Sequence, residues 1–358
     1  MKNEDLGYNS FFETNRNRLK LDGFSVARVI AEYKEAYRIK NENGEYFAKV
    51  TGKKIFDSTS RENFPAVGDW VSIKEQDEEW AIIKEILPRQ TVIKRKYNSK
   101  NDAQIIATNI DVAFVVESIG RDFNLNRFER YFSIANDGGV SVAIILNKAD
   151  LVTKEELDLK LTQIKERFKD VSVFSTSVLA NFGLEELKSY ILPRHTYCFL
   201  GSSGVGKSSL INKLLEKNAI ETNDISFQTG RGKHTTTGRE MYFLKDGGIV
   251  IDNPGMREVG MADANEGIDN IFDEITELSK RCKFADCSHI SEPGCNVLSA
   301  LKSGELNEEK YSNYLNLKKE TEYYDMTEVE RNEREYKFGK FIKNAKKEIE
   351  KYKSSRKF

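Results

Sequence analysis

Hydrophobic and polar positions follow different patterns in successive parts of the chain. Residues 1–20 are polar and show no hydrophobic period, so we expect a flexible, loosely ordered arm. In residues 21–98, short segments rich in β-forming residues, such as 25–30 and 80–83, are separated by turn signals such as the pair Asn43 and Gly44. Five short strands in about 75 residues fit a small closed barrel of the OB-fold type.

Longer apolar runs characterise residues 104–261. The runs 112–116, 140–146 and 197–200 alternate with helix-like segments, which is typical of an α/β domain with a mostly parallel, buried sheet. Residues 262–358 are charged and helical in pattern, apart from a group of cysteines. The pattern predicts a multidomain α/β protein, in which an OB-fold barrel precedes the α/β domain and a helical domain follows it.

Composition narrows the class of protein. With 358 residues, of which 39% are hydrophobic, the chain can bury the cores of two or three domains. No stretch approaches the roughly 20 apolar residues that cross a bilayer, and the amino terminus lacks the apolar run of a signal peptide. We therefore expect a cytoplasmic protein without a membrane partner, and a monomer as the default state.

Charge is balanced overall but uneven near the end of the sequence. The whole chain has 56 lysines and arginines against 57 acidic residues, which does not indicate a polyanionic partner. Residues 343–358 nevertheless contain seven basic and two acidic residues. This basic tail could neutralise the phosphates of a nucleic acid, and a solvated helix face is the alternative interpretation.

The most specific single motif is a phosphate-binding loop. Residues 201–208 match the pattern G-x-x-x-x-G-K-[ST], follow a predicted strand and open a predicted helix. The backbone N–H groups would surround the phosphates, Lys207 would reach the β- and γ-phosphates, and Ser208 would ligate Mg²⁺. The predicted nucleoside triphosphate site comprises Gly201, Ser202, Ser203, Gly204, Val205, Gly206, Lys207, Ser208 and Ser209.

A second motif indicates which base is bound. Asn147, Lys148 and Asp150 form an N-K-x-D sequence after an apolar run, and this sequence resembles the guanine-specificity motif of GTPases. Asp150 would accept hydrogen bonds from guanine N1 and the exocyclic amine, an arrangement that adenine matches poorly. Lys148 would lie along the base, and Asn147 would tie this loop to the phosphate loop. Ser177 and Val178 loosely resemble the second base-contacting loop, where a backbone N–H contacts guanine O6.

Two further segments resemble the nucleotide-sensing switches of GTPases. Residues 230–237 resemble the first switch, in which Thr236 would ligate Mg²⁺, with Thr235 as the alternative ligand. Asp252 and Gly255 belong to a D-x-P-G sequence that resembles the second switch. There Asp252 would hold Mg²⁺ through water, and the Gly255 N–H would sense the γ-phosphate.

The order of these motifs is circularly permuted. In ordinary small GTPases the phosphate loop comes first, whereas here Asn147 precedes Gly201. Joining the original termini of a compact domain and cutting the chain elsewhere preserves the same three-dimensional site. The second switch then lies at the carboxyl end of the domain, so the segment that follows it is tied to the nucleotide state.

Hydrolysis requires a group that positions the attacking water. Many GTPases use a glutamine directly after D-x-x-G, but this chain has Met256 there. Intrinsic hydrolysis should therefore be slow, on the order of 10⁻⁴ to 10⁻² per second. His234, beside the switch threonines, is the candidate catalytic residue because a neutral imidazole can accept a proton or a hydrogen bond. An ordinary exposed loop histidine is the alternative.

The cysteines form a compact motif of their own. Cys282, Cys287, His289 and Cys295 are spaced C-x₄-C-x-H-x₅-C, which suits a closed tetrahedral Zn²⁺ site. With four protein ligands no position remains for water, so the metal would be structural rather than hydrolytic. Three reduced cysteines in a small core are the alternative.

Taken together, the predicted barrel, the permuted motifs and the cysteine motif closely resemble the RsgA (YjeQ) family of small-ribosomal-subunit-dependent GTPases, over about residues 20–340. The resemblance implies GTP and GDP as ligands, Mg²⁺ and one structural Zn²⁺, and a role in late small-subunit assembly. It also implies that the barrel, the zinc region and the basic tail contact ribosomal RNA. Two departures are Asn253, where the family usually has threonine, and the loop at Ser177, which deviates from S-A-K.

Three other readings remain open from the sequence. A different permuted GTPase could act on another RNA assembly, although it should lack this pairing of barrel and zinc motif. A nucleotide-dependent RNA-binding switch without hydrolysis is compatible with Met256. An ATPase would require that Asp150 takes no part in base recognition.

Overall fold

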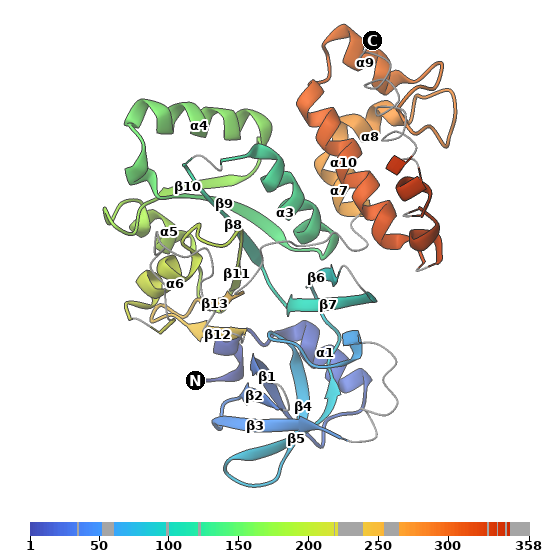
Figure 1. Cartoon of the computed structure of the whole chain (residues 1–358). Coiled ribbons are helices and arrows are strands. Elements are labelled where there is room, and N and C mark those ends of the chain that lie inside the picture. The colour runs from blue at the N-terminus through green and yellow to red at the C-terminus, as the bar shows by residue number, and fades with distance from the viewer. Residues whose placement is uncertain are drawn as a thin grey trace, which may run out of the picture.

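The computed structural model describes residues 1–33, 36–51, 61–97, 100–120, 123–217, 219–220, 239–253, 265–327, 329–334, 336–340 and 342–343. Three parts are visible in Figure 1: a barrel near the amino terminus, a central α/β domain, and a helical carboxyl-terminal region. Within the described residues, no helix is long and apolar enough to cross a membrane.

The first part is a closed five-stranded barrel. Its strands pair in the order β1-β2-β3-β5-β4, and an antiparallel β1–β4 pairing closes the ring. Buried and exposed residues alternate along β3, where Tyr46 and Ala48 point into the barrel core and Phe47 points outward. This architecture confirms the OB-like barrel. The strands are β1 (Ser25–Glu32), β2 (Tyr37–Lys40), β3 (Glu45–Val50), β4 (Trp70–Glu75) and β5 (Trp80–Ile86).

The amino-terminal segment differs from the flexible arm expected from its polar sequence. It forms the short 3-10 helix η1 (Asn3–Leu6) and helix α1 (Ser10–Arg18). Leu6 and Phe12 are almost completely buried in a cluster with Trp70 of the barrel. Leu6 and Phe12 therefore order this segment, although it has no hydrophobic period, because each buries most of a large apolar side chain.

A buried arginine joins this segment to the barrel and to the next domain. Arg28, on β1, is 1% exposed. Its guanidinium donates hydrogen bonds to the carbonyl oxygens of Leu6, of Gly68 at 3.3 Å and of Asn109 at 3.0 Å. Burial lowers the pKa of Arg28 to about 10, so the group stays charged at neutral pH. The three carbonyls supply the partners that a buried cation requires.

A two-stranded hairpin, β6 (Val92–Tyr97) and β7 (Lys100–Thr108), leads from the barrel to the α/β domain. It spans the expected boundary between residues 98 and 104. The short 3-10 helix η2 (Arg61–Asn63) lies in the chain between β3 and β4.

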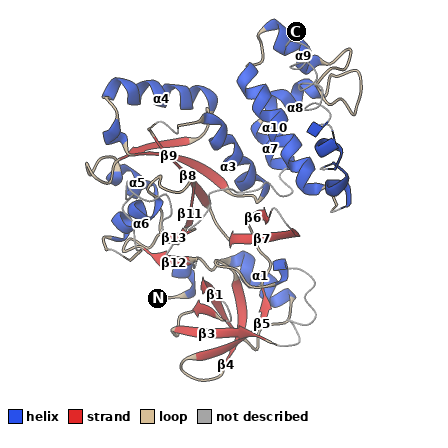
Figure 2. Ribbon diagram, in the orientation of Figure 1, coloured by secondary structure: helices blue, strands red, loops and turns tan. Residues whose placement is uncertain are grey.

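The α/β domain contains the predicted parallel sheet. Its strands lie in the order β10-β9-β8-β11-β13-β12, and only β12 is antiparallel to its neighbour. Helices cover both faces of the sheet (Figure 2). The strands are β8 (Val112–Ser118), β9 (Ser141–Asn147), β10 (Ser172–Thr176), β11 (Thr196–Leu200), β12 (Glu240–Phe243) and β13 (Ile249–Asp252). The helices are α3 (Leu125–Asp137), η3 (Ala149–Leu151), α4 (Lys154–Arg167), α5 (Leu184–Tyr190) and α6 (Lys207–Leu215).

The barrel and the α/β sheet meet along one edge. Ala31 of β1 pairs with Glu240 of β12, so the two sheets form one continuous hydrogen-bonded series. Arg239 strengthens this joint, because it lies 3.5 Å from the Glu32 carboxylate and donates to the Ile105 carbonyl at 3.0 Å.

The carboxyl-terminal region packs against α3. Gly267 of α7 approaches the α3 backbone so closely that a Cβ there would lie 2.0 Å from the Ser133 carbonyl oxygen. Arg130 of α3 pairs with Glu320, with N–O distances of 2.9 and 2.5 Å. The predicted helical character is confirmed by α7 (Asn265–Ile271), α8 (Asp273–Ser279), α9 (Asn296–Ser303) and α10 (Glu308–Asp325).

Candidate nucleotide-binding site

The predicted phosphate loop connects β11 to α6 at the carboxyl edge of the parallel sheet. Gly201 and Gly206 have φ angles of 144° and 99°, values that side chains rarely allow. A Cβ on Gly201 would lie 2.2 Å from the Val116 carbonyl oxygen, and one on Gly206 would lie 2.3 Å from Asn147 Nδ2. Glycine is therefore required at both positions, by conformation and by close approach.

Lys207 lies across the phosphate loop. Its ammonium donates to the carbonyl oxygens of Gly201 at 2.7 Å and Ser202 at 2.8 Å. Burial lowers the pKa of Lys207 to about 8, although the carboxylates of Asp252 and Glu117 favour its charged form. A cation in this position can pair with the negative charge of a phosphate.

Ser208 and Asp252 face each other at the ends of α6 and β13. The Ser208 hydroxyl lies 3.4 Å from Asp252 Oδ2, and Asp252 is 3% exposed. Burial raises the pKa of Asp252, while Lys207 opposes that shift. The second oxygen, Oδ1, is buried and has no hydrogen-bond partner among the described residues. A hydroxyl and a carboxylate with a spare oxygen fit a hard cation such as Mg²⁺.

The N-K-x-D motif is tied to the phosphate loop. Asn147 Nδ2 donates to the Val205 carbonyl at 2.8 Å, and Lys148 Nζ donates to the Gly204 carbonyl at 2.7 Å. Thr176, at the end of β10, donates to Asn147 Oδ1 at 3.0 Å and fixes its amide. The sequence motifs did not identify Thr176, because a hydroxyl at a strand end has no motif.

The second expected base loop lies beside Asp150. The Ser177 hydroxyl donates to the Asp150 carboxylate and accepts from the Ala180 N–H at 3.0 Å. The Ser177 N–H donates to the Phe182 carbonyl at 3.0 Å. Because that N–H is already used, a guanine O6 contact from this loop would come from a following residue such as Val178.

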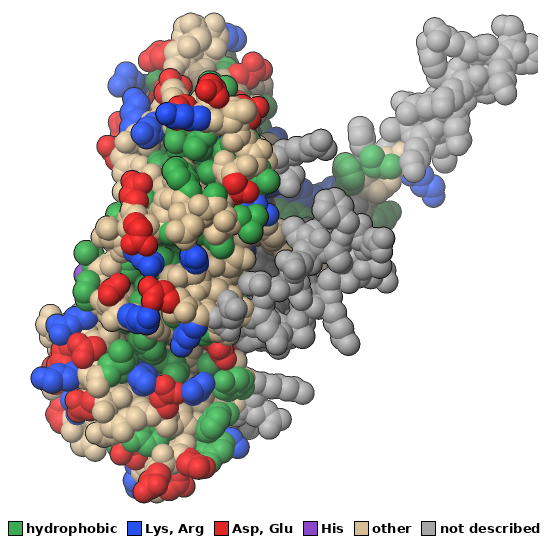
Figure 3. Space-filling model, turned by 90° about the vertical axis from the view of Figure 1, so that its left-hand side faces the viewer, with side chains coloured by type: hydrophobic (Ala, Val, Ile, Leu, Met, Phe, Trp, Pro, Cys, Tyr) green, Lys and Arg blue, Asp and Glu red, His purple; other side chains and the backbone are tan. Residues whose placement is uncertain are grey.

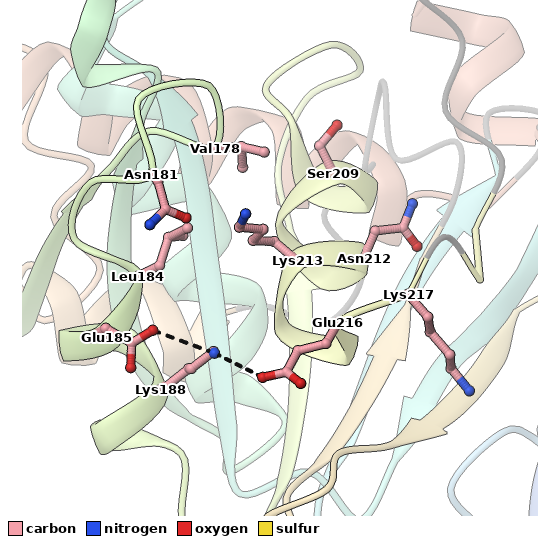
Figure 4. A pocket seen from close by; sticks show the side chains of 10 residues that line it. All are labelled: Val178, Asn181, Leu184, Glu185, Lys188, Ser209, Asn212, Lys213, Glu216 and Lys217. Atoms are coloured by element: carbon pink, nitrogen blue, oxygen red, sulfur yellow. Dashed lines mark hydrogen bonds and ion pairs between the residues drawn. The ribbon is translucent and has the colours of Figure 1, made fainter.

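A pocket of about 690 Å³ opens between α5 and α6 (Figure 4). Val178 from the second base loop and Ser209 from the phosphate-loop helix both line it, so the pocket adjoins both predicted nucleotide loops. Lys213 points into it. The complete lining is Val178, Asn181, Leu184, Glu185, Lys188, Ser209, Asn212, Lys213, Glu216 and Lys217.

The switch residues are placed only in part. His234, Thr235, Thr236, Gly255 and Met256 lie outside the described residues.

Asn253, one of the two departures from the family pattern, is 1% exposed. Its side-chain amide lies 2.8 Å from Cys198 Sγ on β11. This contact anchors the start of the second switch to the strand that leads into the phosphate loop.

The cysteine motif gathers into one cluster between α8 and α9. The ligand atoms of Cys282, Cys287, His289 and Cys295 all lie within 4.8 Å of one another. Cys282 Sγ is 3.8 Å from Cys295 Sγ and 3.6 Å from His289 Nδ1, and Cys295 Sγ is 3.4 Å from His289 Nδ1. Tetrahedral Zn²⁺ separates two sulfurs by about 3.8 Å and a sulfur from a nitrogen by about 3.6 Å. The donor set therefore fits Zn²⁺.

A parallel sheet that carries an N-K-x-D loop before its phosphate loop, with both loops joined by hydrogen bonds, defines a circularly permuted GTPase. The chain belongs to the RsgA GTPase family, whose model matches residues 86–262. The small ribosomal subunit biogenesis GTPase RsgA 2 of Lactiplantibacillus plantarum is 42% identical over 306 residues, which cover 85% of each chain. The protein named RsgA 2 of Vibrio vulnificus is 34% identical, covering 98% of this chain and 97% of that one.

The crystal structure of YjeQ from Thermotoga maritima has a similar fold. The two structures superpose with a TM-score of 0.60 at 24% identity, covering 83% of this chain and 98% of that one. Family membership removes the reading of a different permuted GTPase.

Proposed function

We propose that this protein binds the small ribosomal subunit, acts late in its assembly, and couples GTP hydrolysis to its own release. The observation that carries the nucleotide chemistry is the pair of hydrogen bonds from Asn147 and Lys148 to the phosphate loop. They hold a guanine-reading motif at a fixed position relative to a triphosphate-binding loop. The partner follows from the relatives, which are named small ribosomal subunit biogenesis GTPases.

Residues of this chain supply distinct parts of the proposed mechanism. Backbone N–H groups of 203–208 and the Lys207 ammonium bind the phosphates, and Asp150 selects guanine. Ser208 and Asp252, with Thr236, would hold Mg²⁺, which neutralises the charge that develops on the phosphate oxygens.

The proposed mechanism also requires a residue that positions the attacking water. Gly255 would sense the γ-phosphate through its N–H. Met256 occupies the place where many GTPases have glutamine, so His234 would position the attacking water or accept a proton from it. Slow intrinsic hydrolysis follows from the missing glutamine, so the small subunit must supply the remaining stabilisation.

Two further features extend the proposal. Cys282, Cys287, His289 and Cys295 would hold one structural Zn²⁺, supported by the separations of their ligand atoms. Ribosomal RNA is the proposed contact of the zinc region and of the basic tail, and we propose that the protein is a cytoplasmic monomer.

The proposal is tested by measuring GTP hydrolysis at a fixed low enzyme concentration with purified small subunits. Large subunits and an unrelated structured RNA serve as controls. We expect small subunits alone to raise the rate at least about tenfold, and Lys207→Ala to abolish that increase. Lys217→Ala is the matched control, because Lys217 follows the carboxyl end of α6, whereas Lys207 lies at the amino end of that helix, in the phosphate loop. Equal rates in every mixture would instead favour another partner or a switch that does not hydrolyse GTP.

A further inference from the structure

The loop that carries the cysteine motif folds around one carboxylate. Glu292 follows His289 by three positions in the chain, and its side chain accepts four hydrogen bonds from this loop. Its Oε1 accepts from the Ser288 N–H at 2.9 Å and from the Ser288 hydroxyl. Its Oε2 accepts from the Ile290 N–H at 3.0 Å and from the Ser291 N–H at 3.1 Å. Successive N–H groups that converge on one anion in this way form a backbone nest.

Glu292 is not an ordinary solvated surface charge. Acidic and basic side chains are scattered over the face of the molecule shown in Figure 3, and exposed charges of that kind contribute little to structure. Glu292 instead receives donors on both oxygens, and the hydrogen bonds from Ser288 are the main cause that lowers its pKa to about 2. The group is therefore ionised at neutral pH. Hydrogen bonds to an ionised acceptor are about twice as strong as those between neutral groups.

The backbone of His289 needs this support because it is left-handed. Its φ angle is 61°, a conformation that residues with a side chain rarely adopt. The donors Ser288 and Ile290 come directly before and after His289, so the carboxylate holds the chain on both sides of the histidine. The Tyr311 hydroxyl of α10 donates to the His289 carbonyl at 2.6 Å and holds the same residue from another element. Glu292 and Tyr311 together stabilise a backbone conformation that is unfavourable by itself.

This backbone conformation directs the imidazole toward the cysteines. His289 is 6% exposed, and its Nδ1 lies 3.6 Å from Cys282 Sγ and 3.4 Å from Cys295 Sγ. The group of side chains that could hold a metal does not include Glu292. Any effect of Glu292 on a metal must therefore act through the loop that presents the histidine.

The turn around Glu292 also leads to the last cysteine of the motif. The Cys295 N–H donates to the Glu292 carbonyl at 3.3 Å. Between them, the Gly294 carbonyl accepts from the Lys283 N–H at 3.1 Å, which joins the turn to the residue after Cys282. The side chain of Glu292 thus fixes a turn whose backbone contacts reach two further cysteines of the cluster.

We propose that Glu292 is a positioning residue of the zinc site, which holds His289 in its ligating orientation before the metal binds. The inference rests on the four-ligand zinc site proposed above. Residues that orient metal ligands from outside the ligand set change metal affinity by about 10- to 100-fold when they are replaced. Glu292→Gln keeps the size of the side chain but puts an NH₂ group in place of one oxygen. That group would face N–H donors of the loop, so one side of the nest would lose its acceptor.

The test measures the Zn²⁺ affinity of the full-length protein by competition with a chromophoric chelator of known affinity. We expect Glu292→Gln to weaken Zn²⁺ binding about tenfold or more, and Glu292→Asp, which keeps the charge, to weaken it less. Ser288→Ala removes only the hydroxyl hydrogen bond and should weaken binding about threefold in a loop that is least disturbed. Glu277→Gln is the matched control, because Glu277 is an exposed glutamate of α8 that pairs with Lys280 at the end of that helix. It should leave the affinity unchanged.

Cobalt distinguishes positioning of the histidine from general stabilisation of the fold. Co²⁺ in place of Zn²⁺ gives visible absorption bands that depend on the ligands and their geometry. We expect these bands to shift and weaken in Glu292→Gln, because His289 would no longer be held toward the metal, and to stay unchanged in Glu277→Gln. The inference is overturned if Glu292→Gln lowers only the unfolding midpoint and leaves the Zn²⁺ affinity and the Co²⁺ bands unchanged. If the unaltered protein binds neither metal, the zinc site itself is overturned, and the inference with it.

Discussion

At the residue scale, the burial of Lys207 links proton binding to nucleotide binding. Burial lowers the pKa of Lys207 from 10.5 to about 8. Between these two values the unfolded chain binds more protons than the folded chain, so stability from this group rises with pH. At neutral pH the charged, buried ammonium opposes folding. A bound phosphate would reverse this balance, because it favours the charged form.

This reasoning predicts that nucleotide affinity falls as the pH approaches and passes 8. We expect the Kd for GDP to be about fourfold higher at pH 8.5 than at pH 7, because only the protonated lysine binds phosphate well. The measurement is a titration with a fluorescent GDP analogue across that range. Lys207→Ala should bind weakly at every pH, whereas Lys217→Ala should retain the dependence. A Kd that stays constant from pH 7 to pH 8.5 would contradict the role assigned to Lys207.

Residue contacts in the site were predictable to different degrees. The N-K-x-D letters led to the expected tie between Asn147 and the phosphate loop, and Asn147 does donate to Val205. Thr176 was missed because its contact depends on register: β9 and β10 pair so that Thr176 lies directly beside Asn147. A single sequence does not specify which strands will be neighbours, so such supporting contacts appear only in the structure.

At the element scale, the cysteine cluster brings together the ends of a segment that has little regular secondary structure. No helix or strand lies between α8 and α9, a segment the structure describes completely, and Cys295 is the N-cap residue that precedes α9. The Tyr311 hydroxyl on α10 donates to the His289 carbonyl at 2.6 Å and ties the cluster to that helix. A metal held by four ligands would contribute folding free energy to this segment directly.

The cluster predicts one tightly bound zinc per chain. We expect elemental analysis of the purified protein to give about one Zn²⁺, as a four-ligand site implies. Chelation or Cys282→Ser should lower the thermal unfolding midpoint and abolish stimulation by small subunits, with intrinsic hydrolysis retained. Cys198→Ala is the matched control for zinc content, because it removes a buried thiol outside the cluster and should leave about one Zn²⁺ bound. If the purified protein contains no zinc, and if Cys282→Ser leaves the unfolding temperature unchanged, the result would support a core of reduced cysteines instead.

Elements with a strong hydrophobic pattern were predictable, and the amino-terminal helices were not. The apolar runs at 112–116 and 197–200 correspond to β8 and β11, because buried parallel strands require continuous apolar residues. Helix α1 is mostly polar and takes its order from Phe12, which packs against Trp70 of the barrel. Its stability therefore comes from tertiary contacts, which local periodicity does not reveal.

At the scale of the whole molecule, the α/β domain that carries the nucleotide site contacts the helical region on one side and the barrel on the other. On one side, α3 carries the Arg130–Glu320 pair that holds the helical region. On the other, Glu240 of β12 pairs with Ala31 of β1, immediately after the segment that contains the predicted first switch. The permuted order of motifs was evident from the sequence. The β1–β12 joint was not, because a contact between two short strands so distant in the chain has no sequence signature.

The barrel joint predicts a residue that couples subunit binding to hydrolysis. Arg239 follows the predicted first switch and contacts both Glu32 of β1 and the Ile105 carbonyl of β7. If binding at the barrel orders the switch through this joint, Arg239→Ala should lower the rate with small subunits about fivefold or more and leave the intrinsic rate unchanged. Arg194→Ala is the matched control, since Arg194 joins Asp5 to the α/β domain at 3.1 Å without contacting β12. An equal loss in both rates would place Arg239 in the nucleotide site itself, and an unchanged stimulated rate would mean that the barrel does not act through β12.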